Sequence, residues 1–163
     1  MATATYTPIA TQTLGSAAAS ITFSSIPSTY TDLRVVITGI TTANAGLQVQ
    51  FNGDASTNYS VTTLYGTGSA AGSANGISES QIRPNKQTST GSTIPWLFTM
   101  DVQSYAGNTN KSALFVTSTD FNGSGTIEPA VGLWRSTSAI TSITVLASST
   151  TFATGTIATL WGI

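Results

Sequence analysis

Apolar and polar side chains alternate along much of this chain, as in strands with one buried face. Leu33, Val35 and Ile37 point to one side of such a strand, whereas Arg34 and Thr38 point to the other. No segment has the i, i+3, i+4, i+7 periodicity of an amphipathic helix. The expected strands lie near residues 5–14, 20–25, 31–40, 46–52, 58–65, 77–83, 95–104, 112–119, 130–135, 139–147 and 155–162.

Turn residues separate these strands at intervals of about ten positions. Asn52-Gly53 suits a tight hairpin, because both residues tolerate a positive φ, and Asn122-Gly123 indicates another turn. We therefore predict an all-β fold, a single antiparallel β-sandwich or jelly roll of roughly 8–11 short strands. One domain would span residues 1–163, with residues 1–13 as an arm or an edge strand.

Two stretches are expected to be long loops. Residues 66–76 are small, and residues 85–93 are polar with few apolar anchors. Loops carry function more often than strands do.

The composition indicates that hydroxyl groups, rather than charges, keep the exposed faces of the strands soluble. Thr and Ser occupy 53 of 163 positions, whereas 7% of the residues are charged and the net charge is -1. A hydrophobic content of 40% is too high for a disordered chain. A surface with so few charges suits a permanent assembly, because little charge has to be desolvated at its contacts.

The absence of His and Cys removes several kinds of chemistry. It excludes disulfides, Cys or His metal sites, thiol nucleophiles and imidazole bases. Five cations do not neutralise a run of phosphates, so we expect no nucleic-acid partner. No stretch has 18 consecutive apolar residues, so we expect no membrane partner, and the N-terminus lacks the features of a secretory signal.

The remaining candidate sites are each better interpreted as structure. Lys86 and Ser89 do not have the spacing of a Ser-Lys pair, and Gly66-Thr67-Gly68 lies outside any βαβ unit. Asn52-Gly53-Asp54 and Asp120-Phe121-Asn122 offer oxygens for calcium but are more simply turns. We predict that the protein is not an enzyme and has no catalytic residues, cofactor or metal site.

Aromatic side chains offer the best binding chemistry, because sugar rings stack on exposed Trp and Tyr. Trp96 and Trp161 lie on alternating apolar faces, which favours burial in a core or an interface. The surface candidates, near strand ends, are Tyr30, Tyr59, Tyr65 and Tyr105.

Four stretches of the chain resemble a known group of proteins. They are Ser25–Leu33, Phe51–Ser60, Val131–Ile143 with its Gly-Leu-Trp-Arg run, and the terminal Leu160-Trp161-Gly162-Ile163. Together they resemble small β-sandwich virion proteins of tailed bacteriophages, including phages of cyanobacteria. The resemblance implies a capsid decoration (cement) protein or the tip of a tail fibre, usually a trimer, and it transfers no catalytic residue.

The sequence favours decoration, because the domain fills the chain and no fibre shaft is evident. The expected partners are the phage major capsid protein and two further copies in a homotrimer. The expected location is the surface of the phage head, after synthesis in the host cytoplasm. The alternatives are a receptor-binding or glycan-binding fibre tip, which would take a host glycan, and a bacterial adhesin-like subunit.

Capsid contacts are expected from the uncharged N-terminal segment and from the loops. The candidate contact residues are Thr3, Thr5, Tyr6, Tyr30, Arg83 and Lys86.

Overall fold

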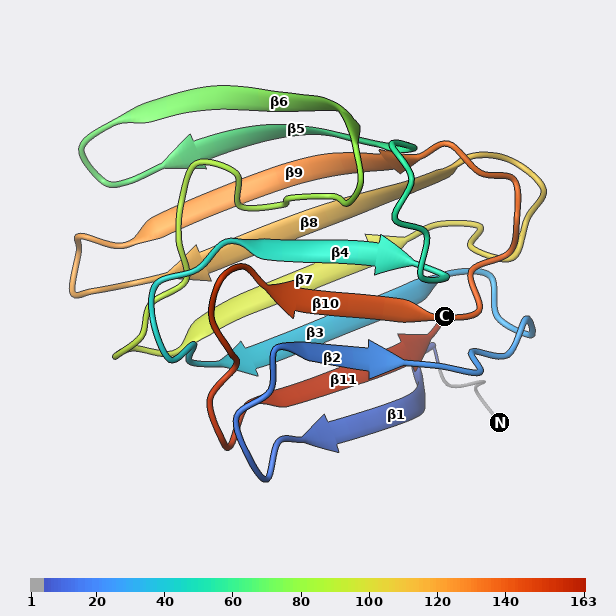
Figure 1. Ribbon diagram of the computed structural model, residues 1–163, viewed down its shortest axis with the longest axis horizontal. Coiled ribbons are helices and arrows are strands. Elements are labelled where there is room, and N and C mark those ends of the chain that lie inside the picture. Colours follow the sequence, from blue (N-terminus) through green and yellow to red (C-terminus); the bar gives the residue numbers. More distant parts are fainter. Residues whose placement is uncertain (1–4) are drawn as a thin grey trace.

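The computed structural model describes residues 5–163, which form two antiparallel β-sheets (Figure 1). Within these residues, no helix is long and apolar enough to cross a membrane. The strands are β1 (Thr7–Thr13), β2 (Ser20–Phe23), β3 (Leu33–Gly39), β4 (Leu47–Phe51), β5 (Tyr59–Gly66), β6 (Ala71–Glu79), β7 (Trp96–Val102), β8 (Lys111–Thr119), β9 (Thr126–Trp134), β10 (Ile143–Ala147) and β11 (Ile157–Gly162).

The two sheets differ greatly in size. Eight strands form the large sheet in the order β1-β11-β3-β7-β8-β9-β5-β6, and three form the small sheet in the order β2-β10-β4. The small sheet lies in front of the large one in the view of Figure 1. The prediction of an all-β antiparallel sandwich is therefore confirmed, and β1 and β6 are the two edges of the large sheet.

One core fills the space between the sheets. Strand alternation puts every second side chain of the large sheet on this inner face, as in β3, where Leu33, Val35 and Ile37 are fully buried. Val49 of β4 and Val145 of β10 belong to the same buried cluster. The other side chains of the large sheet point away from the small sheet, and we call this side the outer face.

Residues 66–76 were predicted to be a loop, and this prediction is wrong. Thr67 and Ala70 close a tight turn, in which the Thr67 N–H donates to the Ala70 carbonyl at 2.9 Å. Residues 71–79 then form β6, antiparallel to β5. Small residues lack the apolar alternation that marks a strand, so the pattern concealed this edge strand.

The Asn52-Gly53 turn has the expected backbone but joins different sheets. Asn52 and Gly53 have φ values of 54° and 66°. However, β4 belongs to the small sheet and β5 to the large one, so the predicted hairpin is wrong. Asn122 and Gly123 also have positive φ, and they lie in the turn of the β8–β9 hairpin.

The segment between β6 and β7, residues 80–95, is a loop, as predicted for residues 85–93. It is nevertheless held firmly against the sheets. Ile82 exchanges two backbone hydrogen bonds with Val49 at the edge of β4. The buried Asn85 side chain accepts a hydrogen bond from the Leu47 N–H at 2.6 Å and donates to the Thr88 carbonyl. Polar groups thus anchor a segment that has few apolar anchors.

Candidate functional site

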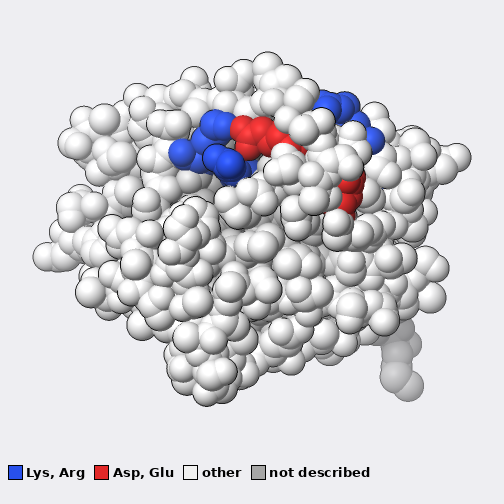
Figure 2. Space-filling view, in the orientation of Figure 1, with Lys and Arg blue, Asp and Glu red and all other residues white. Residues whose placement is uncertain are grey.

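All eleven charged side chains contact partners within the protein. Figure 2 shows that, on the side of the small sheet, the visible charged side chains form two groups in the upper part of the view, and the rest of that side is uncharged. Asp32 and Asp120 accept backbone N–H groups from Ser104 and Gly123, both at 2.8 Å. Among the described residues, no group of three or more acidic side chains is placed to hold a metal ion.

Arg83 and Lys86 share one carboxylate. Arg83 lies 3.3 Å from Glu79, and the Lys86 amine donates to the other Glu79 oxygen. These two predicted contact residues are therefore brought together by the fold. Glu79 offsets one of their two positive charges, so one net positive charge remains at this place for an acidic partner.

Two charged side chains are buried in structural positions. Glu128, on the inner face, accepts hydrogen bonds from the backbone of Gln87 and from the backbone and hydroxyl of Thr88. The Lys111 amine donates to the carbonyls of Gly107 and Thr109, and burial lowers its pKa. A buried charge needs partners, and here the partners are backbone groups of loops. Each of the two side chains therefore holds a loop in place.

Asp54 fixes the turn after β4 to the end of β9. Its carboxylate accepts the Trp134 indole N–H at 2.7 Å, the Asn58 amide at 3.1 Å and the Ser56 N–H at 2.8 Å. The bond from Trp134, more than the others, lowers the pKa of Asp54 to about 2. Tyr59 stacks on Trp134, and burial raises the pKa of its hydroxyl to about 12.

This carboxylate makes stability depend on acidity. The folded-state pKa of about 2 lies below the ordinary 3.8, so its contribution is present above pH ~4 and is lost as the pH falls through about 2. We expect the unfolding free energy of Asp54→Asn to fall less than that of the wild type when the pH is lowered across this range. Urea unfolding at pH 2 to 5 measures the unfolding free energy of both proteins, with Asp120→Asn as the control. An Asp54→Asn variant with the wild-type pH slope would contradict this assignment.

The outer face of the large sheet is apolar at its centre. In β7, β8 and β9 the outward side chains alternate with buried ones. Leu114 lies directly opposite Val131, and two rows further along β8 Leu97 and Ile127 flank Ser118. The apolar side chains of these three strands, each between 36% and 52% exposed, are Leu97, Leu114, Val116, Ile127 and Val131.

Further apolar side chains widen this surface. Leu64 of β5 and Ile157 of β11 are exposed on either side of the three strands. Together these side chains form a broad exposed apolar area, and the largest apolar patch on a protein surface is often functional. We refer to Leu64, Leu97, Leu114, Val116, Ile127, Val131 and Ile157 as the outer apolar patch.

One charged pair borders the outer apolar patch. Arg34 and Asp101 pair across β3 and β7 at 3.4 Å, and Asp101 is directly opposite Leu114. Arg34 also donates to the Tyr6 hydroxyl at 3.1 Å. The predicted contact residue Tyr6 thus lies at the rim of the outer face, where it is 44% exposed.

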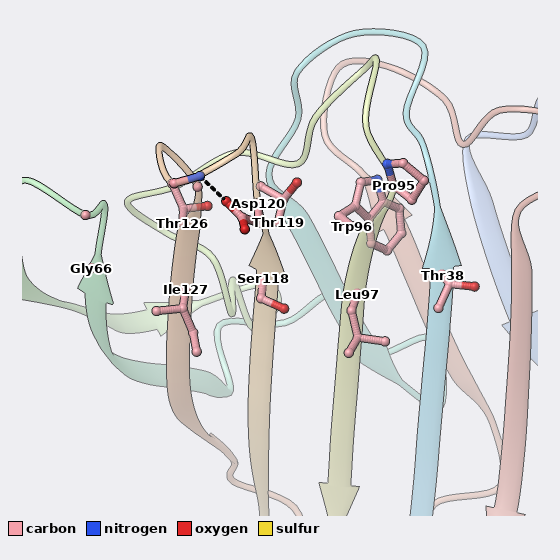
Figure 3. Close-up of a pocket in the computed structure, with 13 residues that line it drawn as sticks. Thr38, Gly66, Pro95, Trp96, Leu97, Ser118, Thr119, Asp120, Thr126 and Ile127 are labelled. Carbon is pink, nitrogen blue, oxygen red and sulfur yellow. Dashed lines mark hydrogen bonds between the residues drawn. The ribbon is translucent and has the colours of Figure 1, made fainter.

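A shallow hollow of about 670 Å³ lies at one end of this face (Figure 3). Leu97, Ser118 and Ile127 line it from three neighbouring strands, and Asp120 lies at its rim. Gly125 is required there, since a Cβ at this position would lie 2.2 Å from the Thr119 carbonyl oxygen. The hollow is mainly apolar and therefore extends the patch.

The fold does not gather the six predicted contact residues into one site. Thr3 lies outside the described residues, and Thr5 is exposed. Tyr6 borders the outer face, whereas Arg83 and Lys86 contact Glu79 beside β6. Tyr30 packs over Gly162 at the end of β11, where a Cβ would lie 2.3 Å from its ring. The outer apolar patch was missed, although Leu97, Leu114 and Val116 occupy the second face of alternating strands.

The aromatic predictions are partly wrong. Tyr59 and Tyr105 are fully buried, because their hydroxyls bond to backbone groups of Phe51 and Pro27 inside the molecule. Trp96 is buried as expected. Trp161 is half-buried on the outer face, where its N–H donates to Thr159.

The stretches that carry the phage resemblance meet each other in the fold. Thr31 and Asp32 donate backbone hydrogen bonds to the Ile163 carbonyl, which joins the first stretch to the last. Phe51, Tyr59 and Trp134 pack together, which joins the other two. These motif residues therefore have structural roles.

Comparison with known proteins leaves the family open. No protein-family model and no curated protein matches the chain. Among solved structures, the galectin LEC-6 of Caenorhabditis elegans matches with 9% identity and a TM-score of 0.36, covering 90% of this chain and 91% of the galectin. A match this weak carries no argument about function.

Proposed function

We propose that the protein is a structural virion protein that decorates the assembled head of a tailed phage and attaches through the outer apolar patch. The observation that carries this proposal is the patch itself, a broad apolar area on a chain whose charged side chains all have internal partners. The phage resemblance supplies the partner, the major capsid protein. The location is then the surface of the phage head.

The patch has the properties of a stable contact rather than of a catalytic surface. Removing water from apolar side chains lowers the free energy of the system, and Ser and Thr beside them allow close packing. Arg34 and Asp101 are already paired, so covering the face leaves no lone charge without a partner.

The proposed mechanism is stabilisation by linkage. A protein that binds the assembled shell and not free capsid subunits shifts the equilibrium toward the shell. Each bound copy bridges neighbouring capsid subunits, so the shell resists the pressure of packaged DNA.

Deleting the gene from the phage tests this proposal. We expect heads without the protein to release DNA at a lower temperature, and added purified protein to restore the release temperature. DNA release followed by dye fluorescence during heating measures this. Equal heat resistance with and without the protein would contradict the proposal.

The alternative, a glycan-binding fibre tip, has less support. Sugar binding favours exposed aromatic rings, but Trp96 and Trp134 are buried, and Tyr6 is the one strongly exposed aromatic side chain among the described residues. Binding of the isolated protein to host polysaccharide, abolished by Tyr6→Ala, would favour the alternative.

A further inference from the structure

The edge of the large sheet at β6 has the properties of a site for pairing with another strand. β6 is nine residues long, and no proline or charge occurs in it before Glu79. In Figure 1 no strand lies beyond β6 at this edge of the large sheet. Sheet edges of this kind template strand addition unless they are blocked.

The other edges are blocked. β1, at the opposite end of the large sheet, contains Pro8 and an irregular register beside it. The edge of β4 exchanges backbone hydrogen bonds with Ile82. At β2, the Gln12 side chain donates to the Thr22 carbonyl. β6 is thus the unprotected edge among the described strands.

The register identifies the free backbone groups of β6. The Thr67 N–H donates to the Ala70 carbonyl, which puts these two residues at a bonded position of the β5–β6 ladder, and in antiparallel strands bonded and non-bonded positions alternate. Gly72 and Ala74, opposite Tyr65 and Thr63, are therefore bonded to β5. The alternate residues are Ala71, Ser73 and Asn75. Their N–H and C=O groups point away from β5.

We propose that β6 pairs antiparallel with β6 of a second copy of this chain. With the two-fold axis at Ser73, the two Ser73 residues face each other and Ala71 faces Asn75. Each of these three pairs exchanges two backbone hydrogen bonds. The side chains at these positions are small or uncharged, and Glu79 lies beyond the paired region, held by Arg83 and Lys86.

Apolar exposure near this edge supports the same partner. Ile77 of β6 and Leu64 of β5 are 73% and 60% exposed, the highest values for large apolar side chains among the described residues. A second copy along β6 would cover part of this surface. It would also place two outer apolar patches side by side on one continuous sheet. The inference rests on the β6 edge and does not depend on attachment to a capsid.

The native mass tests this pairing, by light scattering on size-exclusion chromatography over a range of concentrations. We expect a dimer near twice 16.7 kDa for the wild type, in place of the homotrimer that the phage resemblance implies. Ser73→Pro removes an outward N–H from each copy and no bond to β5, so the dissociation constant should rise at least ~10-fold. Asn75→Lys should act similarly by adding edge charge, whereas Thr22→Lys, on the small sheet, should have no effect.

Hydrogen exchange supplies a second readout. The amides of Ala71, Ser73 and Asn75 should exchange slowly at high protein concentration and quickly after dilution. A wild-type monomer at all concentrations would overturn the proposal. So would a trimer that persists in Ser73→Pro, since an antiparallel β6 pair has two-fold symmetry.

Discussion

Opposite charges placed in the outer apolar patch are expected to abolish attachment to phage heads without unfolding the protein. Leu114→Lys with Val131→Glu is the test variant, because these two side chains face each other across β8 and β9. The new charges would pair across the strands, which preserves the fold. At a covered interface, their desolvation would weaken binding by at least ~100-fold.

A matched control exists on the small sheet. Thr22 and Thr144 also face each other across two strands, and their hydroxyls lie 3.1 Å apart. Thr22→Lys with Thr144→Glu introduces the same charges outside the patch, and binding should stay at the wild-type level. Cosedimentation with heads from the deletion phage measures both variants, and circular dichroism verifies folding. Full binding by the Leu114 and Val131 variant would exclude the patch as the attachment surface.

Removing the Trp134 side chain is expected to have the largest effect on stability. Trp134 is 3% exposed, stacks on Tyr59 with 6.3 Å between ring centroids, and donates to Asp54 at 2.7 Å. Trp134→Ala leaves a large cavity and breaks this bond, so unfolding free energy should fall by about 3–5 kcal/mol. Urea unfolding followed by circular dichroism measures the change.

Two further variants separate packing from the hydrogen bond. Trp134→Phe keeps most of the ring but loses the N–H, so about 1–2 kcal/mol should be lost and the pKa of Asp54 should rise. Trp161→Ala removes an indole that is half-buried on the outer face and should cost less than Trp134→Ala. Equal losses for Trp134→Ala and Trp161→Ala would contradict the structural role of the Asp54 contact.

The strands were predictable because alternation is a local property of the sequence. Leu33, Val35 and Ile37 mark β3 by themselves, since their burial on one face requires only period two. β6 was placed wrongly because Gly72, Ser73 and Ala74 give no contrast between its faces. The separation of β4 and β5 into different sheets depends on distant partners, Val145 and Val131, which no turn signal specifies.

The candidate surface was harder to predict than the fold. Alternation places Leu97 and Leu114 on the faces opposite Trp96 and Ala113, but it does not say which face the small sheet covers. Only the arrangement of the two sheets leaves these side chains in solvent. Glu128 likewise resembles a solvent-exposed strand residue in the sequence, and its burial depends on Gln87 and Thr88 in a distant loop.

The position of the protein on intact phage particles is the direct test of its proposed attachment to the head. Gold-labelled antibodies against the purified protein, viewed by electron microscopy, would report its position on head or tail. If the protein decorates the head, the label should be distributed over the head surface and absent from heads of the deletion phage. Label confined to the tip of the tail, or absent from wild-type particles, would contradict this attachment.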